Sequence, residues 1–205
     1  MNIIQYSSEI KDYLLSNEII DFTDKSIANL SNELLNLSKD RIDFIKRTYE
    51  YVRDNICHSA DINNDMITCS ASEVLKAGHG ICFAKSHLLA ALLRYQSIPC
   101  GLCYQKIILD DETAPILIYH GLNGVYIEEY DKWIRLDARG NVNGINAQFS
   151  IETEQLAFSI RQDKGEQDIF VVYSEPDVKI VESLRTNKTR TELWNNLPTN
   201  LAYIV

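Results

Sequence analysis

The 205-residue chain carries a formal net charge of −9, with 45% hydrophobic and 24% charged residues. This length and composition predict one soluble globular domain with a sizeable core. The acidic balance lacks the basic patch typical of nucleic-acid-binding proteins, and an anionic membrane surface would repel the chain. We therefore expect neither nucleic acid nor a membrane as a partner.

The cysteines and the first residues bear on the cellular compartment. The chain begins without a basic segment followed by an apolar one, and no apolar run is long enough to span a bilayer. Five cysteines are an odd number, and their spacing matches no secreted disulfide framework. We interpret them as reduced thiols and expect a cytoplasmic protein.

Hydrophobic periodicity predicts helices in the first half of the chain and mainly strands in the second. In chain order, we expect helices up to about residue 38 and over 40–54, 70–78 and 82–95, strands over 102–109, 116–120, 124–129 and 133–137, a helix over 152–161, a strand over 170–173, and a broken helix over 182–197. Residues 130–132 predict a hairpin turn. Helices followed by an antiparallel sheet make an α+β domain.

A tight turn delivers the chain into the helix that begins at Cys82. Ser70 can cap the preceding short helix, Glu73 stands at the capping-box position, and Gly78 can close that helix in a left-handed conformation. Cys82 then lies in the first turn of the next helix, where free N–H groups and the helix dipole favour a thiolate. Gly80 carries no side chain that would block a substrate. Cys82 is therefore a candidate nucleophile.

A nucleophilic cysteine needs a base, and histidine titrates near neutral pH. His87 lies five residues after Cys82, roughly 140° around the helix, and cannot face the thiol. Nothing in the sequence orients His79 in its turn or His58 in its irregular polar stretch. His120 ends a predicted strand, which is a rigid support, and is the candidate base.

A carboxylate at the end of a neighbouring strand can orient the base. Asp137 ends the predicted strand 133–137 and could hold the imidazole of His120 in one tautomer and stabilise its charged form. Asp131 is the competing carboxylate, but it fits a solvated turn residue. The residues thus predict a Cys–His–Asp set in the order Cys82, His120, Asp137.

Seven segments together resemble the transglutaminase-like core domain. They are Gly80-Ile81-Cys82, Leu92-Leu93-Arg94, Ile98-Pro99, His120, Trp133-Ile134-Arg135-Leu136-Asp137, Tyr51-Val52-Arg53-Asp54-Asn55-Ile56 and Ala71-Ser72-Glu73-Val74-Leu75. The resemblance extends from about Tyr49 to Asn141 and is similar in type to small bacterial members described as cysteine proteases or acyltransferases.

This resemblance implies a papain-like α+β fold, with the nucleophile at a helix N-terminus packed against an antiparallel sheet. Cys82 matches the family's nucleophile, His120 its base and Asp137 its orienting acid. We expect one transglutaminase-like domain over 1–205, with a core at about 40–145, an N-terminal helical extension over 1–39 and a C-terminal extension of strand and helix over 146–205. The implied activity is attack on amide bonds of a protein or peptide, in the backbone or a glutamine side chain, through a thioester resolved by hydrolysis or acyl transfer.

The residue that assists the oxyanion does not carry over from the family. Papain-like enzymes add a side-chain donor to the cysteine's backbone N–H. The animal members use an aromatic donor upstream of the cysteine, and both tryptophans of this chain lie downstream of it. Asn55, His58 and Tyr51 are the candidates. The calcium sites of the animal enzymes have no match either, so we expect no metal and no cofactor.

Two other readings compete with an enzyme. Cys100 and Cys103 form a C-x-x-C to which His79 and Cys82 could add zinc ligands, but a structural zinc normally takes a second similarly spaced pair. The other reading is a catalytically silent domain of the same fold that binds a protein partner. The full set of Cys82, His120 and Asp137 argues against it, because a binding module needs no such set.

Overall fold

The structure of the chain is a computed structural model that describes residues 3–142 and 144–202. Its helices are α1 (Lys25–Asn36), α2 (Arg41–Asn55), α3 (Ala71–Ala77), α4 (Cys82–Tyr95), α5 (Val178–Thr186) and α6 (Arg190–Asn195), with short 3-10 turns η1 (Ile10–Leu14), η2 (Glu128–Tyr130) and η3 (Gln162–Lys164). Its strands are β1 (Ile4–Gln5), β2 (Cys57–His58), β3 (His79–Gly80), β4 (Cys100–Asp110), β5 (Ala114–Ile127), β6 (Lys132–Leu136) and β7 (Gln167–Tyr173).

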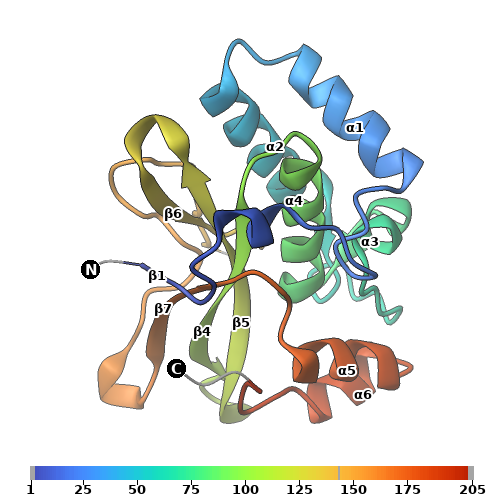
Figure 1. Ribbon diagram of the computed structural model, residues 1–205. Helices are drawn as coiled ribbons and strands as arrows, with labels where there is room; N and C mark the ends of the chain where they lie inside the picture. Colours follow the sequence, from blue (N-terminus) through green and yellow to red (C-terminus); the bar gives the residue numbers. More distant parts are fainter. Residues whose placement is uncertain (1–2, 143, 203–205) are drawn as a thin grey trace.

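The main sheet has the strand order β1-β7-β4-β5-β6, and all its pairs except β1–β7 are antiparallel. Helices α1 to α4 gather at one side of this sheet, as Figure 1 shows. Strands β2 and β3 form a separate parallel pair just before α4. The fold is therefore α+β, as predicted.

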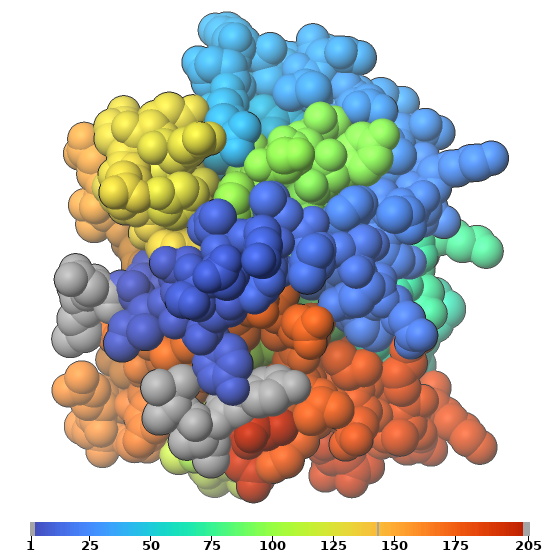
Figure 2. All heavy atoms as spheres, in the orientation of Figure 1, coloured from blue at the N-terminus to red at the C-terminus, as the bar shows by residue number. Residues whose placement is uncertain are grey.

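The N-terminal segment packs on β7 at one edge of the sheet. Ile4 pairs with Val171, and the hydroxyl of Tyr13 donates to the carbonyl of Val172 at 3.0 Å. Figure 2 shows the N-terminal residues, in dark blue, lying across this face between the yellow β6 hairpin and the orange C-terminal segment. The prediction of a helix is therefore wrong for the residues before α1, because strand pairing with β7 outweighs the local helix preference there.

Helix α4 lies at the centre of the molecule. Every residue from Phe83 to Arg94 is buried, so the helix packs on all sides and not along one stripe. The guanidinium of Arg94, 2% exposed, donates to the carbonyls of Cys100, Leu15 and Ser174 at 2.8, 2.7 and 2.6 Å. These bonds compensate for the burial of a charge and tie the segment after η1 and the segment after β7 to α4.

The turn before α4 has the local chemistry that the sequence predicts. Ser70 Oγ accepts the backbone N–H of Glu73, and the Glu73 carboxylate accepts the backbone N–H of Ser70 at 3.1 Å, which completes the capping box. Gly78 closes α3 with φ of 72°, in the left-handed region. The chain then passes through β3 directly into Cys82.

Three predicted elements of the second half differ from the structure. The separate strands 116–120 and 124–129 are one continuous strand, β5, whose interior glycines serve close packing instead of a turn. Residues 152–161 form no helix. They follow an irregular path, in which Gln155 bridges Gln148 and the N–H of Ala157 binds Asp137. The hairpin at Asp131, the strand β7 and the broken helix α5–α6 are confirmed.

His87 faces away from Cys82, as its spacing in the helix predicts. It is 1% exposed, and its Nδ1–H donates to the carbonyl of Cys69 at 2.8 Å. Burial lowers the pKa of His87 to about 4. Between pH of about 6.5 and 4, the imidazole of His87 is therefore protonated in the unfolded chain but not in the folded chain.

We expect the protein to lose stability through His87 as the pH falls from about 6.5 toward 4. The loss is about 1.4 kcal/mol per pH unit, or about 2 kcal/mol at pH 5. Urea unfolding at pH 7 and pH 5 measures it. His87→Gln keeps an amide that can donate but does not titrate, so its free energy of unfolding should depend less on pH. An unchanged pH dependence in that variant would contradict the assignment.

Candidate active site

Cys82 is the first residue of α4. Its preceding residue, Ile81, is extended, provides no side-chain cap, and no acidic side chain stands in the first helical turn. The N–H groups at this end therefore remain available to an anion, and the dipole is not neutralised locally. Cys82 is partly exposed, and Cys69, Cys100 and Cys103 are buried. The local geometry is that of an accessible sulfur at a helix N-terminus.

His120 and Asp137 meet across the β5–β6 pair. The pairing of Asn123 with Leu136 sets the register that brings these side chains together. His120 Nε2 and Asp137 Oδ2 are 2.8 Å apart, with the residues 3% and 1% exposed. The Asp137 carboxylate also accepts the N–H groups of Arg139 and Ala157, each at 3.1 Å. The carboxylate is thus held from three directions, and it orients the imidazole.

The electrostatics favour a charged pair. Burial alone would lower the pKa of His120, but the Asp137 carboxylate and Cys82 outweigh it and raise that pKa to about 10. Burial alone would raise the pKa of Asp137, but His120 and the two backbone N–H groups lower it below its usual value. Because Nε2 binds Asp137, the other ring nitrogen of His120 is left for Cys82. The edge of Phe158 packs against the ring, with centroids 4.9 Å apart.

Gly121 sets the close approach of α4 to the sheet. A Cβ at this position would lie 2.6 Å from Cδ1 of Phe83, the residue after Cys82. Only glycine leaves room for the first turn of α4 against β5. The absence of a side chain beside His120 therefore brings the sulfur near the imidazole.

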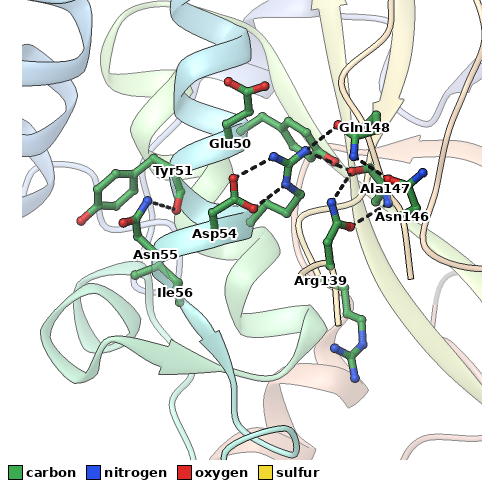
Figure 3. A network of polar contacts seen from close by, with 12 residues as sticks. Glu50, Tyr51, Asp54, Asn55, Ile56, Arg139, Asn146, Ala147 and Gln148 are labelled. Atoms are coloured by element: carbon green, nitrogen blue, oxygen red, sulfur yellow. Dashed lines mark hydrogen bonds and ion pairs between the residues drawn. The ribbon is translucent and has the colours of Figure 1, made fainter. Parts of the chain in front are cut away.

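The three oxyanion candidates lie in different places. His58 lines the cavity that also contains Cys82 and His120. Asn55 and Tyr51 are not among the described residues lining it; Asn55 Nδ2 donates to the carbonyl of Tyr51 at 3.3 Å near the end of α2. Figure 3 shows these two side chains on the side of α2 turned away from Arg139.

His58 is buried, with a ring nitrogen that is unpartnered in the described part of the chain. Its Nδ1 has no hydrogen-bond partner among the described residues. Burial, reinforced by the positive charge of Arg139, lowers the pKa of His58 to about 3. The ring is therefore neutral at physiological pH and keeps one N–H donor.

A buried lysine connects α4 to the segments around the site. Lys85, 1% exposed, donates to the carbonyl of Ile56, to that of Arg139 at 3.1 Å and to that of Arg53 at 3.4 Å. These carbonyls belong to the last turn of α2, to Ile56 between α2 and β2, and to the loop after Asp137. Lys85 therefore holds these three segments against the first turn of α4.

A second network fixes the loop that follows Asp137. Arg53 on α2 donates to the carbonyl of Ala147 at 3.0 Å and forms an ion pair with Asp54 at 2.7 Å. Asn141 closes the loop on itself through two bonds to the backbone of Ala147, at 3.0 and 2.7 Å. Figure 3 shows this network between α2 and the loop. It restrains the backbone on which the Asp137 carboxylate depends.

The site opens into a cavity of about 320 Å³. Its apolar walls include Phe83, Ile107, Ile118, Phe158, Trp194 and Leu197. A larger cavity of about 740 Å³ runs along β6 beside Asp131 and Trp133, and its described lining residues include none from the first cavity. The sequence analysis did not place Phe158 or Trp194 at the site. Phe158 fell in a predicted helix, and no local sequence pattern connects either residue to Cys82.

The described part of the chain contains neither a cluster of metal ligands nor a membrane-spanning helix. In 3–142 and 144–202, no group of three or more His, Cys, Asp or Glu side chains is arranged to hold a metal ion. Cys100 and Cys103 are both free thiols in the core. No described helix is both long and apolar enough to cross a membrane.

A helix-borne cysteine beside a sheet-borne histidine and aspartate, in an α+β fold, defines a papain-like arrangement. The model of the transglutaminase-like superfamily matches residues 28–138, which is more than half of the chain. The chain belongs to this superfamily. No curated protein matches it significantly.

Solved structures are similar to the chain at low sequence identity. A putative cysteine protease from Cytophaga hutchinsonii is 18% identical, with a TM-score of 0.53 over 65% of this chain and 43% of that one. The periplasmic domain of TgpA from Pseudomonas aeruginosa, bound to ethylmercury, is 13% identical, with a TM-score of 0.46 over 62% of this chain and 47% of that domain. A TGase is 18% identical, with a TM-score of 0.41 over 72% of this chain and 39% of that one. The chain thus spans less than half the length of each.

Proposed function

We propose that the protein is a cysteine enzyme that acts on amide bonds of a protein or peptide through a thioester on Cys82. The observation that carries the proposal is the His120–Asp137 pair, 2.8 Å apart, beside a partly exposed cysteine at a helix N-terminus. We further propose that it works in the cytoplasm without a metal or another cofactor.

The first half-reaction forms the thioester. The Cys82 thiolate attacks the carbonyl carbon of a peptide bond or of a glutamine side-chain amide, and the carbonyl oxygen becomes an oxyanion. The C–N bond then breaks, and the His120 imidazolium gives its proton to the departing amine or ammonia. Asp137 stabilises the charged ring before this transfer and holds its orientation throughout.

The second half-reaction releases the acyl group. Neutral imidazole on His120 takes a proton from water or from an acceptor amine, which attacks the thioester carbonyl. The C–S bond breaks, and the thiolate returns as the leaving group. Water gives a carboxylic acid, and an amine gives a new amide.

The oxyanion is stabilised at the N-terminus of α4, where the N–H of Cys82 has no intrahelical acceptor. We assign the additional donor to His58, because it is neutral and lines the same cavity as the sulfur. The separation of Asn55 and Tyr51 from that cavity favours this choice among the three candidates.

His58→Ala should lower amide turnover by on the order of 10²-fold, the usual effect of losing one oxyanion donor. Alkylation of Cys82 by iodoacetamide forms no oxyanion, so its rate should change little. Both rates can be measured on one preparation, and His58→Asn should recover part of the turnover. Equal losses in turnover and in the alkylation rate would show instead that the substitution changes the position or reactivity of Cys82.

Selective alkylation tests the proposed function itself. The thiolate displaces iodide from iodoacetamide, and mass spectrometry of the digested protein reports which cysteine reacted. At pH 7, Cys82 should react faster than the exposed Cys57, although it is the less accessible thiol. Burial raises the pKa of Cys69 to about 11 and of Cys100 to about 12, so these two serve as unreactive controls. If Cys82 reacts no faster than Cys57, the silent protein-binding domain becomes the better explanation.

A further inference from the structure

The cavity beside Cys82 continues past the reacting atoms into an apolar compartment. Its floor is formed by Ile107 on β4 and Ile118 on β5, which are paired in register and are 7% and 6% exposed. Phe83, the residue after the nucleophile, and Phe158, which packs on His120, line it near the site. The compartment is thus continuous with the place where a carbonyl would meet the sulfur.

The outer wall comes from parts of the chain beyond the family match. Phe158, Trp194 and Leu197 all line the cavity, and all follow residue 138, where the match to the superfamily ends. This wall therefore belongs to the chain's own C-terminal segment and not to the shared core.

Helix α6, which carries Trp194, is anchored beside the cavity. Arg190 donates to Asn63 Oδ1 at 2.6 Å and to the carbonyl of Asn64 at 3.2 Å, and its backbone N–H donates to the carbonyl of Asp65 at 2.9 Å. Its guanidinium lies 5.6 Å from the centre of the Trp194 ring. These contacts attach the helix to the segment that follows His58, so the wall is set by specific bonds.

Arg139 and Asp110, which bring charge to the cavity lining outside the His120–Asp137 pair, are engaged within the protein. Arg139 forms a two-pronged ion pair with Asp61, at 2.6 and 2.8 Å. Asp110 accepts the N–H groups of Thr113 and Glu112 in its own turn. A charged substrate group placed here would lose water without gaining a dedicated partner.

We infer that this compartment binds a large apolar side chain on the acyl part of the substrate, next to the carbonyl that Cys82 attacks. The inference rests on the proposed function and adds its substrate class: peptides with an aromatic or large aliphatic residue at the acylated position. A volume of about 320 Å³ is at the small end of ligand cavities and suits one such side chain. Burial of that apolar side chain contributes binding free energy that a glycine or a charged residue at the same position does not contribute.

Matched affinity labels can test this substrate class without knowledge of the natural substrate. N-acetylated phenylalanyl, glycyl, glutamyl and lysyl chloromethyl ketones present a ketone where the scissile carbonyl would lie. The Cys82 sulfur forms a bond to the methylene carbon, the C–Cl bond breaks, and chloride leaves with the electron pair. Iodoacetamide reports the reactivity of the thiolate without a side chain.

The phenylalanyl label should modify Cys82 at least about tenfold faster than the other three labels, each rate constant being divided by that for iodoacetamide. Trp194→Ala should reduce this preference severalfold, and Trp194→Phe should retain most of it. Tyr130→Ala, which removes a 58% exposed aromatic ring from the β5–β6 hairpin, should leave the preference unchanged and is the matched control.

The outcomes separate the two proposals. If iodoacetamide does not modify Cys82 preferentially, the proposed function is wrong and the substrate class is withdrawn with it. If iodoacetamide reacts as expected but the four ketones react equally, or the charged ones react faster, only the apolar compartment is wrong. A preference that survives Trp194→Ala unchanged would show that the C-terminal wall does not determine it.

Discussion

Cys82→Ala is expected to reduce amide turnover to background, a loss on the order of 10⁴-fold or more, because the proposed thioester forms on this sulfur. His120→Ala should have a comparable effect, since both half-reactions require proton transfer by that ring. Ammonia release from N-acetylphenylalaninamide, whose acyl group is of the class inferred above, measures turnover, and hydroxamate formation with added hydroxylamine shows whether an amine can resolve the thioester.

The controls separate chemistry from folding. Cys57→Ala removes the exposed thiol and should leave turnover unchanged. Circular dichroism should show native secondary structure in all three variants. His120→Ala should also slow the alkylation of Cys82 at pH 7, because the imidazolium that favours the thiolate is gone. Full turnover by Cys82→Ala would refute the mechanism.

Asp137→Asn is expected to impair turnover by about 10²- to 10³-fold and to leave it measurable above Cys82→Ala. Asp137 orients and stabilises the imidazole but forms no bond to substrate, and in related triads its loss is the mildest of the three. The helix terminus and His120 continue to favour the thiolate in this variant. Steady-state turnover of the same amide measures the difference.

The structure adds a stability effect to this prediction. The buried carboxylate accepts hydrogen bonds from the His120 ring and from the backbone N–H groups of Arg139 and Ala157. An amide group must turn its NH₂ toward one of these donors, which leaves that donor unsatisfied and costs about 1–3 kcal/mol of unfolding free energy. We expect the fold to persist by circular dichroism, with a lower midpoint in urea.

Asp131→Asn is the matched control. The Asp131 carboxylate accepts the hydroxyl of Tyr126 on the β5–β6 hairpin and lines the larger, separate cavity. Turnover should therefore be unchanged. A fully active Asp137→Asn beside an inactive Asp131→Asn would show that the other carboxylate serves the base.

The local parts of this site could be predicted from the sequence because they depend on neighbours in the chain. The capping box of Ser70 and Glu73, the left-handed Gly78 and the position of Cys82 at a helix start all follow from spacings of a few residues. Helix geometry also correctly predicted that His87 points away from the Cys82 sulfur, because side-chain direction in a helix is fixed by 3.6 residues per turn.

The remaining features depend on contacts between residues far apart in the chain. The pairing of His120 with Asp137 requires the β5–β6 register, which the sequence could suggest but only the packed sheet determines. Local preference predicted a helix at residue 158 and at the N-terminus, where the structure has an irregular segment against His120 and a strand on β7. The place of His58 in the cavity and the closing of its wall by Trp194 were decided by tertiary packing alone, because no local pattern connects those residues to Cys82.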